Sequence, residues 1–182
     1  MQATIDQSRY RKALYRNLNE AGRAILERRA MVGLEKANTY HSMDFIRIAY
    51  DAIFNDMIAH AIKLFEDNSR VASFWYIKRC KEKDIVNFIT QKRIDISKLE
   101  KINDSLKYIR DKTHFHIDKD AVKDSKKIWN KAKVTGRELA EAIDIAWKIM
   151  DHLYELDMGN KFSLPEYDGL DATKIAKYAS TL

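Results

Sequence analysis

The stretch Ser97–Asp118, SKLEKINDSLKYIRDKTHFHID, carries the helical signal and the chemistry that mark this chain. Its first half repeats apolar residues at helical spacing: Leu99, Ile102, Leu106 and Ile109. Residues three and four apart share one face of an α-helix, so this half predicts an amphipathic helix with one buried stripe. Ser97 and Glu100 have the spacing of a capping box, which predicts that the helix starts at Ser97.

The second half of the stretch gathers charged groups and imidazoles. These are Arg110, Asp111, Lys112, His114, His116 and Asp118. A guanidinium holds phosphate oxygens through forked hydrogen bonds, and an imidazole moves protons near neutral pH. The pattern therefore indicates phosphate chemistry, with a solvated helix end as the alternative. In a straight helix Arg110 lies about 40° from His114 and about 120° from His116, so joint action with His116 requires a bend or a second subunit.

The spacing of these residues resembles a known family signature. Asp111 follows Arg110 directly, and five residues separate Arg110 from His116. The arginine, the small polar residue and the histidine after four to six intervening residues resemble the motif of the HEPN superfamily. Asp118, two residues after the histidine, makes the string most similar to the abortive-infection-type branch. By this spacing His116 is the working histidine, and His114 is its rival.

The resemblance implies a function. Many HEPN proteins are metal-independent ribonucleases that act as dimers. His116 would then move a proton at the RNA 2′-hydroxyl or the leaving oxygen, and Arg110 would hold the phosphate. Asp111 would orient Arg110, and Lys112 would add phosphate affinity. His114 and Asp118 would support the site.

The resemblance also implies partners, which are RNA, a second copy of the chain and a cognate antitoxin of a toxin–antitoxin or abortive-infection system. No metal and no cofactor are expected. Some HEPN toxins carry a modified tyrosine two residues after the histidine. This chain has Asp118 there, so control by nucleotide transfer to that position is not expected.

Composition favours one all-α domain over residues 1–182. The chain has 182 residues with only 5 Gly and 1 Pro, and so few chain breakers favour long helices over a sheet with many turns. We expect a HEPN-like bundle of four to five main helices with short extra helices, and a partly irregular segment with a short helix over 159–182. The single Cys80, the polar N-terminus and the lack of a long apolar run predict a cytoplasmic protein without a membrane span.

Apolar periodicity places the main helices at 7–36, 42–65 and from Thr135 to Gly159. The 42–65 segment is the most hydrophobic, and it is apolar on so much of its circumference that it is expected at the centre of the bundle. His60 in this segment is expected to be a hydrogen-bonded core histidine rather than a ligand. Thr135 and Glu138 form a second capping-box pattern.

Charge is concentrated around the Arg110–His116 motif. Residues 70–133 contain 18 Lys and Arg against 9 Asp and Glu, whereas the remainder has 15 against 18. A positive field beside a phosphate-handling motif favours nucleic acid. Di-iron carboxylate bundles need repeated Glu-x-x-His pairs, and the nearest match is Asp111-x-x-His114 alone. The alternative functions are a non-catalytic HEPN-like module that binds nucleic acid or a protein, and, with little support, a helical DNA-binding regulator.

Overall fold

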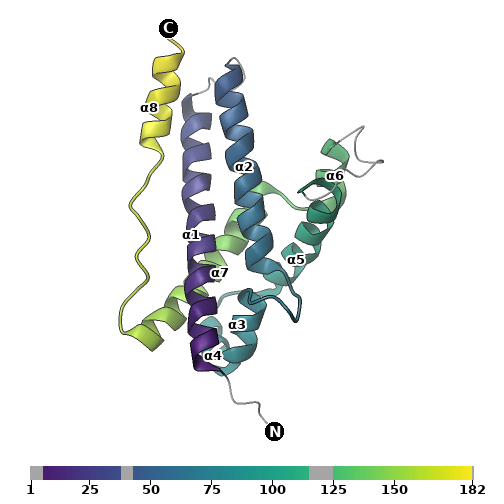
Figure 1. Cartoon of the computed structure of the whole chain (residues 1–182), viewed down its shortest axis with the longest axis vertical. Helices are drawn as coiled ribbons and strands as arrows, with labels where there is room; N and C mark the ends of the chain where they lie inside the picture. The colour runs from purple at the N-terminus through teal and green to yellow at the C-terminus, as the bar shows by residue number, and fades with distance from the viewer. Residues whose placement is uncertain (1–5, 38–42, 115–124, 182) are drawn as a thin grey trace.

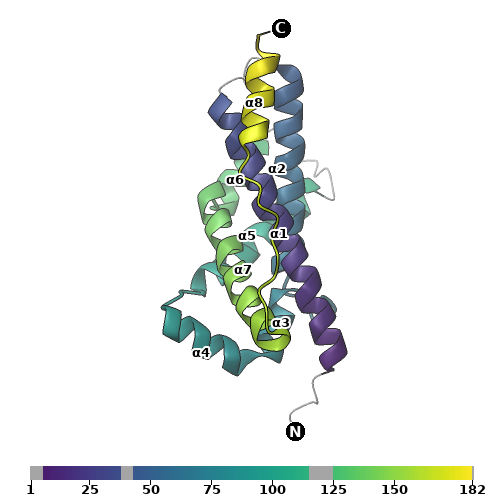
Figure 2. The same cartoon turned by 90° about the vertical axis from the view of Figure 1, so that its left-hand side faces the viewer.

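The computed structural model describes residues 6–37, 43–114 and 125–181, and within these ranges the chain is helical with no strand. An antiparallel pair of long helices, α1 and α2, forms its axis, and the other helices pack around the pair (Figures 1 and 2). The elements in chain order are α1 (Gln7–Ala37), α2 (Asp44–Phe65), α3 (Phe74–Cys80), α4 (Glu82–Lys92), α5 (Ser97–Ile109), the π-helical turn η1 (Arg110–His114), α6 (Ser125–Ala132), α7 (Gly136–Met158) and α8 (Leu170–Ala179). The predicted all-α class is confirmed.

The central helix is α1, not α2. Twelve residues of α1 are buried, because α2, α7 and α8 pack against different parts of its surface. The prediction that α2 is central is wrong for its first half, where Phe45 and Ile48 are 76% and 63% exposed and Ala52 is also exposed. In both views the α1–α2 pair extends beyond α5 and α7, and only α8 accompanies it there (Figures 1 and 2). At that end Phe45, Ile48 and Ala52 are therefore exposed, whereas Ile46 is buried against Leu34 and Ala176.

The helix ends follow the sequence in part. The Thr135 side chain accepts from the Glu138 backbone N–H, and the Glu138 carboxylate accepts from the Thr135 N–H, so this capping box is confirmed. Gly159 ends α7 in the left-handed conformation. The capping box predicted at Ser97 is wrong, since the Asp95 carboxylate accepts from both the backbone N–H and the hydroxyl of Ser97. Asp95, rather than the Ser97 hydroxyl, therefore accepts the hydrogen bond from the first backbone N–H of α5.

After α7 the chain runs back along the molecule without regular structure and ends in α8, as predicted (Figure 1). At α8 the backbones of two glycines meet. A Cβ added at Gly33 of α1 would overlap with the carbonyl oxygen of Gly169, the residue that precedes α8. The Thr173 hydroxyl donates to the Gly33 carbonyl at 2.8 Å. Gly33 therefore permits the close approach of α8 to α1.

None of the described helices combines the length and the hydropathy that a bilayer span requires.

Gly33→Ala is expected to destabilise the protein by about 1–3 kcal/mol, because α8 must move to relieve the overlap with Gly169. The free energy of unfolding in urea measures the loss. Gly136→Ala is the matched control: a Cβ there meets nothing within 4 Å, and Gly136 begins α7. The control is expected to be neutral or to stabilise by up to about 1 kcal/mol. Equal effects of the two substitutions would contradict the role assigned to Gly33.

Candidate functional site

The apolar stripe of α5 leads directly into the predicted site. Leu99, Ile102, Leu106 and Ile109 are all buried, as their spacing predicts. At Arg110 the helix widens from α to π geometry and stays so to His114. A π-helical turn is rare and often occurs at functional sites, because it breaks the regular helical register. The straight helix assumed from the sequence therefore does not continue through the motif.

Arg110 joins the end of α5 to the end of α2. Its Nη1 donates to Glu66 Oε1 at 2.7 Å, and its Nε and Nη2 lie 2.9 and 2.8 Å from Asp111 Oδ1. The hydrogen bond with Asp111 is the main cause that raises the pKa of Arg110 above its usual value. About a quarter of the Arg110 side chain is exposed, at 26%. Two carboxylates thus hold the guanidinium of a side chain that stays partly exposed to solvent.

A pocket of about 320 Å³ opens beside Arg110, between the end of α2 and one face of α5. Its ionisable lining residues are Glu66, Asp67, Asp104, Lys107 and Arg110. Carboxylates outnumber cations here, although residues 70–133 as a whole are basic. The excess of lysine and arginine in that region therefore does not gather in this pocket.

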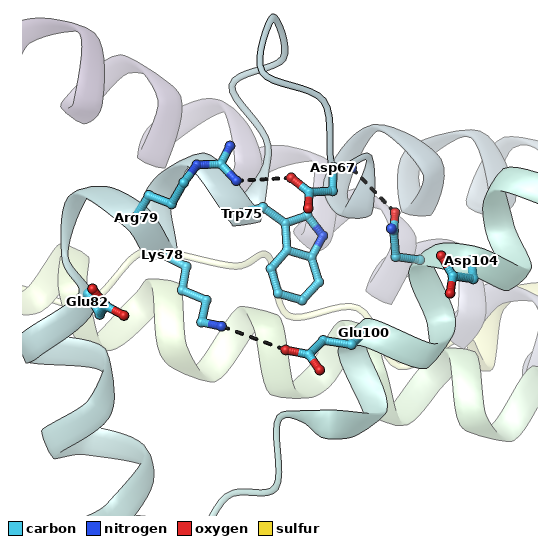
Figure 3. A pocket seen from close by; sticks show the side chains of 8 residues that line it. Asp67, Trp75, Lys78, Arg79, Glu82, Glu100 and Asp104 are labelled. Carbon is cyan, nitrogen blue, oxygen red and sulfur yellow. Dashed lines mark hydrogen bonds and ion pairs between the residues drawn. The ribbon is translucent and has the colours of Figure 1, made fainter.

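A second hollow of about 440 Å³ shares Asp67, Asn103 and Asp104 with the first (Figure 3). Ion pairs close it on two sides, with Arg79 Nη1 3.0 Å from Asp67 and Lys78 Nζ 3.9 Å from Glu100. The Trp75 ring lies at its base, and its Nε1 donates to the Phe65 carbonyl at 2.8 Å.

Trp75 is only 6% exposed. It is a core residue, and its ring is not presented for base stacking.

The structure places part of the predicted site. Arg110 and Asp111 are in contact, and Lys112 lies half-buried in η1. His114 belongs to η1 by its backbone. His116 and Asp118 lie outside the described residues, so the pairing of Arg110 with His116 stays a prediction. Glu66, the residue that sequence analysis missed here, lies 44 positions from Arg110 along the chain, and no local spacing signals it.

A second cluster of ionisable groups lies between α1 and α2, centred on His60. The ring is 3% exposed, and its Nδ1 lies 2.5 Å from Glu20 Oε2. Its Nε2 lies 3.4 Å from Glu27 Oε1 and 3.6 Å from Asp56 Oδ2. The burial and the hydrogen bond expected of His60 are confirmed. The three carboxylates around it were not predicted, although Glu20 and Glu27 are two turns apart on α1 and Asp56 and His60 are one turn apart on α2.

These contacts shift several pKa values. The pKa of His60 is raised, chiefly by Glu27 and with a further contribution from Glu20, although burial opposes the rise. The shorter contact is the one with Glu20. Burial raises the pKa of Glu27. Burial also acts to raise the pKa of Glu20, but hydrogen bonds from His60 and Lys63 outweigh it and lower the value.

No protein-family model matches the chain, and no curated protein or solved structure is significantly similar to it.

The His60 cluster predicts a pH dependence of stability. A histidine whose folded pKa is raised stabilises the fold fully below its unfolded pKa of about 6.5 and loses this contribution as pH rises through the folded value. With EDTA present to remove divalent metal ions, the wild type is expected to be more stable than His60→Gln. This difference in unfolding free energy is expected to shrink as pH rises above about 6.5. Urea unfolding between pH 5.5 and 9 measures it. A difference that grows with pH would contradict the assignment.

Proposed function

We propose that the chain is a metal-independent ribonuclease of the HEPN type, in which Arg110 holds a phosphate and His116 transfers protons. The observation that carries the proposal is the position of Arg110. It lies at a π-helical turn and lines an open pocket, with its side chain partly exposed. The Arg110–His116 spacing and the basic excess of residues 70–133 support the same conclusion.

Glu66 and Asp111 bear on how Arg110 would act. A guanidinium has five N–H donors, and Glu66 and Asp111 use only part of them. A phosphate that enters the pocket competes with Glu66 for Arg110 Nη1. Asp111, which contacts Nε and Nη2, then holds Arg110 in a fixed orientation, so that little reorganisation is needed as charge develops on the phosphate oxygens.

In the proposed reaction His116 accepts the proton of an RNA 2′-hydroxyl. The 2′-oxygen then forms a bond to the adjacent phosphorus, and the bond from phosphorus to the 5′-oxygen breaks. The leaving 5′-oxygen takes a proton from a second acid, and the product is a cyclic phosphate. His116 of a second copy of the chain is the natural source of that proton, because each copy carries one motif.

A homodimer is therefore part of the proposal. The exposed apolar stripe of Phe45, Ile48 and Ala52 on α2 supports it, since a contiguous apolar surface of this kind marks an interface. An isologous contact repeats the same surface on both copies, so each copy contributes one motif to the dimer. A monomer mass in light scattering at micromolar concentration would contradict this part of the proposal.

The proposal extends to a toxin of an abortive-infection or toxin–antitoxin system that acts on RNA in the cytoplasm and is restrained by a cognate antitoxin. If the chain is such a toxin, cells that express the wild type stop growing, whereas cells that express Arg110→Ala continue to grow.

A second function is favoured by one specific observation, the engagement of Arg110 with Glu66 and Asp111. Under this alternative the arginine fastens α5 to α2, and the chain is a non-catalytic HEPN-like helical module that binds nucleic acid or a protein. The two functions assign different roles to Glu66. In the ribonuclease Glu66 competes with the phosphate, whereas in the binding module it only stabilises the fold.

The ribonuclease is expected to cleave single-stranded RNA in EDTA. Arg110→Ala and His116→Ala are each expected to lower the rate by about 10²–10⁴, because each removes a group that acts on the reacting phosphate. Tm should change little, since neither side chain belongs to the buried stripe of α5. His114→Ala is the control and should be milder. If only His114→Ala abolishes cleavage, His114 is the working histidine.

Glu66→Gln separates the two functions. It removes the charge that competes with phosphate but keeps the shape of the side chain, so RNA affinity is expected to rise several-fold if Arg110 binds phosphate. Glu100→Gln is the matched control, because Glu100 pairs with Lys78 in the neighbouring hollow at 3.9 Å. If Glu66→Gln lowers Tm and leaves RNA affinity unchanged, and if Arg110→Ala does the same, the ribonuclease proposal is wrong.

A further inference from the structure

We infer that Glu27, Asp56 and His60 form a binding site for a divalent transition-metal ion between α1 and α2, with Glu20 as the residue that positions His60. The inference is independent of the proposed ribonuclease. Glu66, which contacts Arg110, caps the end of α2 six residues beyond His60, so the two sites lie at different positions along the helix.

The distances suit a shared ion. The three ligand atoms, one from each side chain, all lie within 4.8 Å of one another. His60 Nε2 is 3.4 Å from Glu27 Oε1 and 3.6 Å from Asp56 Oδ2. Two ligands that each bind one Zn²⁺ at about 2.0–2.1 Å with tetrahedral geometry are themselves about 3.4 Å apart. The observed separations are thus longer than good hydrogen bonds and close to the edges of a coordination tetrahedron.

The histidine is oriented as metal ligands are. Glu20 Oε2 lies 2.5 Å from Nδ1, so Nδ1 carries the proton and Nε2 faces the other two carboxylates. A carboxylate behind a ligating histidine fixes the ring and makes its free nitrogen more basic. His60 is 3% exposed, so packing also holds the ring in place.

A second observation favours a cation at this position. Glu27 Oε2 is buried and accepts no hydrogen bond from any described residue. A buried carboxylate oxygen without a partner is costly, because it has lost its water and gained nothing in return. An ion beside Glu27 would offset that cost.

Charge balance favours the metal over a proton. The cluster contains three carboxylates, Glu20, Glu27 and Asp56, and one ammonium group, Lys63, which lies 3.2 Å from Glu20. With a second proton on His60 the cluster keeps a net charge of −1. With neutral His60 and a divalent ion the net charge is zero. Binding therefore replaces the proton on Nε2 by the ion.

The donor set selects the class of metal. One imidazole and two carboxylates suit Zn²⁺, Mn²⁺ or another first-row ion, whereas Mg²⁺ and Ca²⁺ prefer oxygen ligands alone. Asp56 is 64% exposed, so the site opens to solvent on the α2 side and water completes the coordination. The ligands come from both helices of the central pair, and the ion would fasten α1 to α2.

Calorimetry with ZnCl₂ on the full chain tests the site. One equivalent is expected to bind, to release protons and, at a hundredfold excess over Kd, to raise Tm by roughly 5–10 °C. Co²⁺ in place of Zn²⁺ should give the visible absorption of a low-coordinate site. Asp56→Asn and Glu27→Gln are each expected to weaken binding by about 10-fold or more. Asp56 is exposed, so its substitution should leave the fold intact.

Two controls match these variants. Asp51→Asn makes the same change at an exposed position of α2, and His152→Gln removes a histidine that stacks on Phe88. Both should bind Zn²⁺ as the wild type does. Glu20→Gln should weaken binding by about 10-fold and move its pH midpoint downward, because a less basic His60 holds its proton less tightly.

The metal proposal is overturned if Zn²⁺ does not bind, or if it binds equally well to Asp56→Asn and Glu27→Gln. The result also separates the two proposals. If Zn²⁺ raises Tm, EDTA abolishes that rise, and the protein still cleaves RNA in EDTA, both proposals are supported. Zn²⁺ binding without RNA cleavage supports the metal site and contradicts the ribonuclease proposal.

Discussion

The burial of α1 against α2, α7 and α8 is the constraint on which the rest of the structure depends. Twelve of the 31 residues of α1 are buried, and the positions that face these helices cannot face water. Small residues make such close packing possible, as at Gly33, where the backbone of α8 approaches. Polar residues on α1 must find partners inside. Asn17, 5% exposed, does so by donating to the carbonyls of Ala13 and Ala72.

The same constraint explains the two kinds of charged group on α1. Arg28 reaches α7 and pairs with both oxygens of Asp144 at 2.9 and 3.0 Å, which is the forked geometry that satisfies an arginine and a carboxylate together. Glu20 and Glu27 face α2, where the basic groups they contact among the described residues are the imidazole of His60 and the ammonium of Lys63. The Arg28–Asp144 pair is therefore balanced in charge, whereas the His60 cluster has an excess of negative charge. A bound cation or an additional proton would reduce the repulsion among carboxylates that an excess of this kind causes at a packed interface.

Periodicity predicted the helices well because it reports local geometry. The stripe of Leu99, Ile102, Leu106 and Ile109 and the start of α7 at Thr135 both depend on residues within a few positions of each other. Which helix is central depends on what covers each face, and hydropathy does not contain that information. Thus α2 is the more apolar helix, but α7 and α8 pack on α1. The Glu20–His60 and Glu66–Arg110 pairs join residues 40 and 44 positions apart, so their spacing in the sequence carries no signal, whereas Asp56 and His60 are one helical turn apart.

The ion pairs of Arg110 are compatible with either function, and burial decides how strongly they oppose phosphate binding. Arg110, Glu66 and Asp111 have side-chain exposures of 26%, 29% and 50%, so water screens these pairs. Partly exposed pairs contribute little, at about 1 kcal/mol or less. An RNA phosphodiester carries one negative charge, as a carboxylate does, and the attack of the 2′-oxygen adds a second that strengthens its attraction to the guanidinium. The competition is therefore small in energy. A fully buried triad would have fixed Arg110 as a structural residue, whereas this one leaves it available for exchange at the edge of the pocket.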